Sequence, residues 1–153
     1  MADIGLTHVA LPVTDLDASV AFYAEFAAME VVHRRGDKPG GEVVWISDMS
    51  RPFVIVLLQV PEVGDRLGGF AHLGVACGSR AEVDRLCDIA RIRGLLRLGP
   101  NDSGPPVGYW AFVSDPDGHN LEISFGQDVG MTVVGAGLEP HRKARDAQAL
   151  PRA

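Results

Sequence analysis

The sequence predicts an α+β fold made of two copies of one βαβββ unit. Two apolar runs, HVALPV starting at residue 8 and HLGVAC starting at residue 72, resemble each other. Each run is followed by a helical segment and then by three further segments with strand character. Because the same order of elements occurs twice, we infer an internal duplication. We expect one module over residues 4–60 and a second over residues 70–126.

The first module begins with an apolar strand over residues 6–13. A helix should follow, because Thr14 can cap a helix and the Asp17 carboxylate stands three residues further on. Within this helix, apolar side chains recur at helical spacing from Leu16 to Ala27. Three strands complete the module, and they are predicted over residues 31–35, 43–47 and 53–60.

The second module repeats this order, starting with a strand over residues 71–77. Ser79 and Glu82 have the spacing of a capping box, and Gly94 is expected to end the helix that they begin. The remaining strands are predicted over residues 95–98, 109–113 and 120–125.

Composition limits the classes of function. The net charge of −6 argues against a nucleic-acid-binding surface. No apolar stretch approaches the roughly 18 residues that a membrane-spanning helix needs. We therefore expect a cytoplasmic protein with a single domain over residues 4–126. Residues 127–153 are predicted to be a C-terminal extension that is flexible from about residue 135.

His8, His72 and Glu122 are the candidate metal ligands, and each lies in a predicted strand. Two histidines and one carboxylate can hold a divalent metal and leave coordination positions open for a substrate. Side chains alternate along a strand, so small residues such as Ala10 and Gly74 share the faces of the two histidines and leave room above them. For either histidine alone, a hydrogen-bonded core position is an open alternative.

Aromatic side chains provide candidate walls for a substrate pocket. We expect Trp45, Tyr109, Trp110 and Ser124 to line it, although alternation puts Tyr109 and Trp110 on opposite faces of one strand. An aromatic wall favours an apolar or ring-bearing substrate.

Two stretches identify a family resemblance. The sequences HVALPVTDLDASVAFY, from residue 8, and FVSDPDGHNLE, from residue 112, resemble the vicinal oxygen chelate superfamily. This superfamily includes glyoxalase I, extradiol dioxygenases, fosfomycin-resistance proteins and bleomycin-binding proteins. The resemblance implies that the paired modules form an open, cup-shaped mixed sheet with any metal in the cup. It also implies a homodimer, with sites built within one chain or across two.

The resemblance also implies a ligand set. His8, His72 and Glu122 match three ligand positions, and the fourth should fall within residues 54–59, where Gln59 is the only side chain able to coordinate. Glyoxalase I normally has four ligands, two of them acidic or amide side chains. Extradiol enzymes usually carry a tyrosine where this chain has Phe112.

By this resemblance, the chain is expected to be a divalent-metal-dependent enzyme that acts on a small molecule through chelation of two adjacent oxygens. The metal would be Fe, Mn, Ni, Co or Zn, and Glu122 would be both a ligand and a general base. The reaction would be that of a glyoxalase-type lyase or isomerase, or that of an extradiol-type dioxygenase. The alternative is a metal-free small-molecule binding module of the bleomycin-resistance type.

Overall fold

The structure, a computed structural model, describes residues 5–36 and 41–130. The first module contains β1 (His8–Val13), α1 (Leu16–Ala27), β2 (Glu30–Arg35), β3 (Val43–Ser47) and β4 (Val54–Gln59). The second module contains β5 (Leu73–Ala76), α2 (Arg80–Ile92), β6 (Leu96–Asp102), β7 (Tyr109–Ser114) and β8 (Asn120–Phe125).

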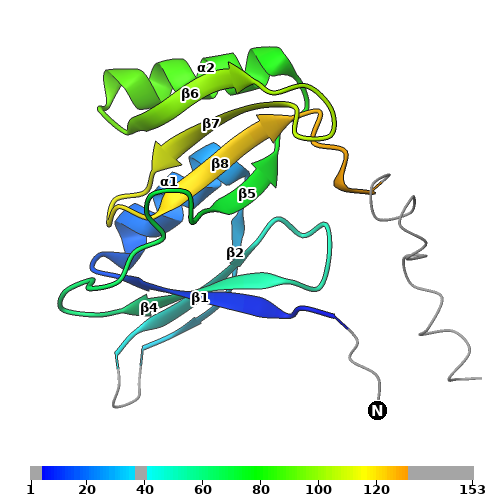
Figure 1. Cartoon of the computed structure of the whole chain (residues 1–153). Coiled ribbons are helices and arrows are strands. Elements are labelled where there is room, and N and C mark those ends of the chain that lie inside the picture. The colour runs from blue at the N-terminus through cyan, green and yellow to red at the C-terminus, as the bar shows by residue number, and fades with distance from the viewer. Residues whose placement is uncertain (1–4, 37–40, 131–153) are drawn as a thin grey trace, which may run out of the picture.

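Each module forms a four-stranded mixed sheet, in the orders β1-β4-β3-β2 and β5-β8-β7-β6. In both sheets the first strand of the module runs parallel to the last, and the other neighbours are antiparallel. Figure 1 shows the second sheet, with α2 over it, above the first sheet. The repeated topology confirms the predicted α+β fold of paired βαβββ modules.

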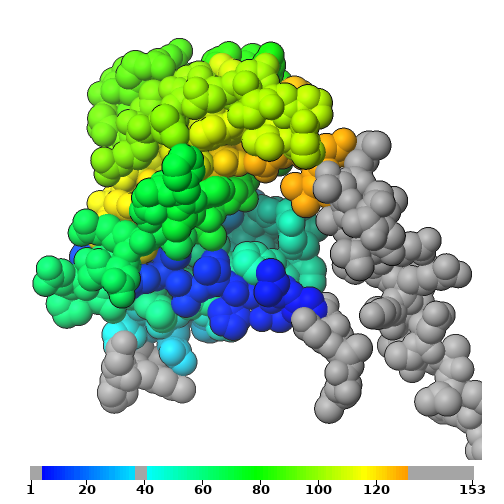
Figure 2. All heavy atoms as spheres, in the orientation of Figure 1, coloured from blue at the N-terminus to red at the C-terminus, as the bar shows by residue number. Residues whose placement is uncertain are grey.

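The core lies on one face of each sheet, where the helices pack. It contains Tyr23 and Phe26 from α1, Leu86 from α2, and Leu121 and Ile123 from β8. Neither of the two helices that the structure describes covers the opposite faces of the sheets. In the space-filling view of Figure 2, the blue residues of β1 accordingly lie uncovered along the lower front of the molecule.

The ends of α1 differ from the prediction. Asp15, and not Thr14, caps the helix, since an Asp15 carboxylate oxygen accepts a hydrogen bond from the Ala18 amide at 2.9 Å. The Thr14 hydroxyl instead donates to Asp117 of the second module at 2.6 Å. At the other end, Ala28 adopts a left-handed conformation with φ of 50°.

The strand β6 is longer than predicted and ends at Asp102, four residues beyond the predicted end at residue 98. Its pairing with β7 shifts register twice between Leu96 and Asn101. Such irregularities break the alternation of side chains. The periodic signal was therefore too weak to extend the strand beyond residue 98.

The turn between β7 and β8 fastens the second module to the first. The Tyr23 hydroxyl donates to the Asp115 carboxylate at 3.1 Å. Burial raises the pKa of this carboxyl group. His119 is only 1% exposed, and its Nδ1 accepts a hydrogen bond from the Leu67 amide. Its Nε2 therefore carries the proton and donates to the Pro12 carbonyl at 2.9 Å.

Several predictions concern the chain beyond the second module. The extension predicted over residues 127–153 is described only as far as Gly130, and its expected flexible part from about residue 135 lies outside the described residues.

Among the helices that the structure describes, none is long and apolar enough to cross a membrane.

Candidate metal centre

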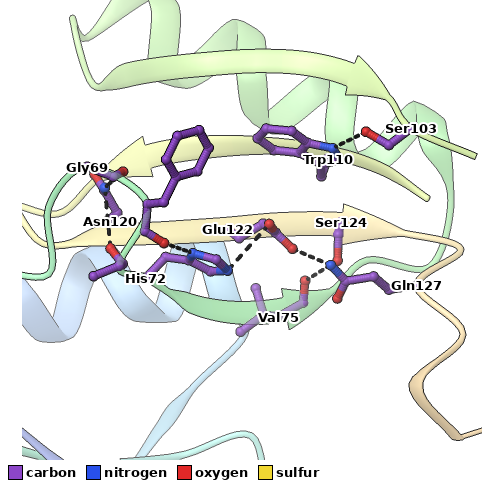
Figure 3. A network of polar contacts seen from close by, with 11 residues as sticks. Gly69, His72, Val75, Ser103, Trp110, Asn120, Glu122, Ser124 and Gln127 are labelled. Atoms are coloured by element: carbon purple, nitrogen blue, oxygen red, sulfur yellow. Dashed lines mark hydrogen bonds and ion pairs between the residues drawn. The ribbon is translucent and has the colours of Figure 1, made fainter. Parts of the chain in front are cut away.

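His72 and Glu122 form a polar pair on the uncovered face of the second sheet. Glu122 is only 6% exposed, and its Oε2 lies 3.5 Å from His72 Nε2 (Figure 3). The other ring nitrogen of His72 lies 2.6 Å from the Phe70 carbonyl oxygen. A carbonyl can only accept, so Nδ1 carries a proton and Nε2 is the ring nitrogen that faces the carboxylate. Either a proton on Nε2 or a metal ion between Nε2 and Oε2 would satisfy both atoms.

Gln127 holds the other oxygen of the same carboxylate. Its amide nitrogen donates to Glu122 Oε1 at 2.5 Å, which leaves Oε2 directed toward His72 (Figure 3). Partners of this kind orient carboxylates in metal sites. Sequence reasoning missed Gln127, because it follows β8 and belongs to no strand pattern. Its only signal was its position five residues after Glu122.

Aromatic rings adjoin this pair. The Phe112 ring lies 4.7 Å from the His72 ring and 5.0 Å from the Trp110 ring, measured between centroids. Ser124 lies on the same face of β8 as Glu122, and its buried hydroxyl donates to the Val75 carbonyl. The structure thus brings Trp110 and Ser124 to the face that carries the candidate ligands.

Tyr109 lies on the opposite face of β7. It packs against the core, and its hydroxyl donates at 2.5 Å to Asp84 of α2. The side chain of Tyr109 therefore does not line the uncovered face on which it was expected. The reason is the alternation along β7, which allows only Trp110 or Tyr109 to face Glu122.

His8 lies apart from this pair, on the uncovered face of the first sheet. It is exposed, and its Nδ1 lies 3.0 Å from the Thr7 hydroxyl oxygen. His8 lines a cavity of about 540 Å³ together with Trp45. Within residues 5–36 and 41–130, no group of three histidine, cysteine or acidic side chains is close enough to hold a metal. One chain therefore does not bring all three predicted ligands together.

The internal symmetry identifies the residue that corresponds to Glu122 in the first module. Gly74, two residues after His72, pairs with Glu122 across β5 and β8. Ala10, two residues after His8, pairs with Val56 across β1 and β4. Val56 therefore occupies the position equivalent to Glu122, and an apolar side chain stands where a fourth ligand was expected.

Gln59 lies on the other face of β4. It is three residues beyond Val56, and an odd separation reverses the face of a strand. Its amide nitrogen is 3.5 Å from the Thr14 carbonyl oxygen, away from the cavity that His8 lines. The expected coordination by Gln59 therefore conflicts with the register of the sheet. The sequence alone had left that register open.

The donor set of His8, His72 and Glu122 fits a divalent metal when the uncovered face of the first sheet meets the uncovered face of the second. Two imidazoles and one carboxylate are common ligands of Fe, Mn, Ni, Co and Zn, and three protein ligands leave positions open for a substrate. The orientation of His72 supports this fit, because its Nδ1 is held by a backbone carbonyl and its Nε2, the nitrogen available to a metal, faces the carboxylate.

Comparisons with known proteins agree with this fold. The sequence model of the Glyoxalase/Bleomycin resistance protein/Dioxygenase superfamily matches residues 5–123. An uncharacterized protein of Pseudomonas aeruginosa is 40% identical over 128 residues, which cover 82% of this chain and 91% of that protein. A probable lactoylglutathione lyase of Synechocystis is 32% identical over 127 residues, which cover 77% of this chain and 92% of that one.

Solved structures show the same fold. A mutant fosfomycin resistance protein from Listeria monocytogenes, in complex with Mn(II) and 1S,2S-dihydroxypropylphosphonic acid, matches with a TM-score of 0.66 and 20% identity. The match covers 86% of this chain and 99% of that chain.

Proposed function

Since this chain belongs to the Glyoxalase/Bleomycin resistance protein/Dioxygenase superfamily, we propose that it is a divalent-metal-dependent enzyme acting on a small molecule that offers two adjacent oxygen atoms. The observation that carries this proposal is the pair formed by His72 and Glu122. His72 Nε2 and Glu122 Oε2 face each other 3.5 Å apart, and the carboxylate is buried, so a metal ion bound by both atoms would offset the cost of burying its charge.

We further propose that the centre is completed across a homodimer, with His8 of one subunit joining His72 and Glu122 of the other. Two observations support this arrangement. Each uncovered sheet face carries part of the ligand set, and large apolar side chains are exposed near both parts. Trp45 in the first module is 41% exposed, and Phe70 beside His72 is 78% exposed. A second copy facing these surfaces would enclose the cavity that Trp45 lines and bring the ligands together.

The residues have distinct tasks in this centre. A bound divalent metal would supply Lewis-acid stabilisation of negative charge on two adjacent substrate oxygens. The Phe70 carbonyl fixes the ring of His72, and Gln127 fixes Glu122 so that only Oε2 faces the open side. Oε2 is therefore the atom that would ligate the metal, and it would accept a proton from the substrate on release from the metal. Phe112 pairs with Glu122 across β7 and β8, so its ring would limit access of water to the carboxylate.

The ligand set bears on the type of reaction. Val56, where a fourth ligand would stand, sets this chain apart from the four-ligand pattern of glyoxalase I. Phe112 likewise lacks the hydroxyl group that an extradiol enzyme usually provides at this place. The lactoylglutathione lyases among the relatives nevertheless favour lyase or isomerase chemistry. We therefore propose a lyase or isomerase in which Glu122 is the sole carboxylate at the metal.

A metal-free binding module is the second candidate function. It is favoured by the cavity of about 540 Å³ in the first module, where Trp45 offers a ring for a planar ligand. That function requires neither His72 nor Glu122. Removal of either side chain would then leave ligand affinity unchanged.

Metal analysis of the purified protein, loaded with Mn(II) and then freed of unbound ions, tests the proposal. We expect about one metal ion per subunit in the wild type and its loss in His72→Ala, because the site has too few ligands without this imidazole. His33→Ala is the matched control and should keep the metal. It removes another exposed histidine, on β2, that lies outside the ligand set. Equal metal content in the wild type and His72→Ala would refute the proposal.

A further inference from the structure

The cavity of the first module has two different polar ends. Apolar side chains from three strands, among them Ala10, Trp45 and Val56, form most of its wall. His8 of β1 lies at one edge of the sheet, and Arg35 of β2 lies at the other. Three strand spacings separate these edges, about 14 Å in all. A ligand that reaches both ends is therefore larger than a three-carbon compound.

Arg35 has no counter-ion among the described residues, whereas its neighbour does. Arg34 lies on the opposite face of β2, where it binds Asp17 at 2.7 Å and Glu42 at 3.1 Å. No carboxylate that the structure describes pairs with Arg35. A guanidinium at the rim of an apolar cavity is suited to bind a carboxylate or a phosphate group of a ligand.

Trp45 lies between the two ends. Within the sheet, Trp45 pairs with His33 of β2 on one side and with Val56 of β4 on the other. The centroid of the His33 ring lies 5.1 Å from that of the indole ring. The indole is 41% exposed. An exposed indole in an apolar wall offers a flat surface to a planar ring.

We propose that this cavity binds the part of the substrate away from the reacting oxygens, and that this part is an apolar ring bearing an anionic group that pairs with Arg35. The statement that this part lies away from the reacting oxygens rests on the proposed function. The binding of the ring and the anion in the cavity does not depend on it. The substrate class is thus a ring-bearing organic anion of moderate size.

The test compares two probes of the same shape, 2-naphthoate and the uncharged 2-naphthamide, by calorimetry on chelator-treated protein. Removal of metal ensures that the carboxylate cannot bind at the metal centre. We expect 2-naphthoate to bind about tenfold more tightly, as a charge-assisted hydrogen bond would give. Arg35→Gln should abolish this preference and leave the affinity for 2-naphthamide unchanged.

Arg34→Gln is the matched control, because it removes the same charge one residue away on the other face of β2. It should keep the preference for the anion. Trp45→Ala should weaken both probes equally. Equal binding of the two probes to the wild type, or an equal effect of the two arginine substitutions, would overturn the proposal. So would a change of oligomeric state in Arg35→Gln without a change in probe preference.

The experiment separates the two proposals. If the naphthoate preference depends on Arg35 but His72→Ala retains all its metal, the anion subsite stands and the metal centre fails. If His72→Ala loses its metal but Arg35→Gln keeps the preference, the metal centre stands and the anion subsite fails.

Discussion

At the scale of single residues, the neighbours of Glu122 decide how its carboxylate is presented. Gln127 holds one oxygen, and His72 Nε2 lies beside the other. The residue types and strand positions of His72 and Glu122 were sufficient to predict this pair. Gln127 and Val56 were not predictable, because the first lies in a loop and the second needed the strand register.

Gln127 should matter for metal affinity more than for stability. We expect Gln127→Leu to weaken metal binding by about 10- to 100-fold, because the carboxylate loses the hydrogen bond that orients it. Titration with Mn(II) measures this loss. Ser124→Ala, which removes a hydroxyl group from the same face without contact to Glu122, should bind metal like the wild type. Equal affinity in Gln127→Leu and Ser124→Ala would show that Gln127 does not position the ligand.

Val56 provides the converse test of the ligand set. Val56→Glu puts a carboxylate at the position equivalent to Glu122, so a fourth protein ligand should raise metal affinity by about tenfold or more. Leu58→Glu adds the same charge on the same face two residues further on and should have no such effect. If both variants gain equally, the gain is a general effect of charge and the symmetry argument is wrong.

At the scale of elements, the two helices show what local sequence rules capture. The Ser79 hydroxyl accepts from the Glu82 amide, and Gly94 follows the end of α2 with a φ of 70°, as predicted, whereas the Glu82 carboxylate, expected to complete the capping box, binds Arg85. For α1 the capping rule predicted Thr14 as the N-cap. The Thr14 hydroxyl instead donates to Asp117 of the second module, and Asp15 caps the helix. The deviation is caused by packing between modules, which local patterns do not contain.

The end of α1 gives a prediction about stability. Ala28 is held at φ of 50°, a conformation that costs a residue with a Cβ atom but not glycine. Ala28→Gly should therefore stabilise the protein by about 0.5–1 kcal/mol. Chemical denaturation measures the change. Ala24→Gly, inside the helix, should destabilise by about the same amount. A loss of stability in Ala28→Gly would contradict the assigned conformation.

At the scale of the whole molecule, the duplication separates two tasks. The helix-covered faces form a shared core, and the turn that carries Asp115 and His119 fastens the modules together. The uncovered faces carry His8 on one sheet and the pair of His72 and Glu122 on the other. The sequence predicted the modules and these three residues. It left open whether one chain or two complete the site, because the relative placement of the modules is a tertiary property.

The most direct test of the composite centre uses mixed dimers of His8→Ala and His72→Ala subunits, co-expressed with different affinity tags and purified on both. In a composite centre, one site of the mixed dimer carries both substitutions and the other carries none. The account therefore predicts about one metal ion per mixed dimer at wild-type affinity, and none in either parent homodimer. If each site lies within a single chain, both sites are damaged. Absence of bound metal from the mixed dimer, when the wild type binds it, would contradict the account.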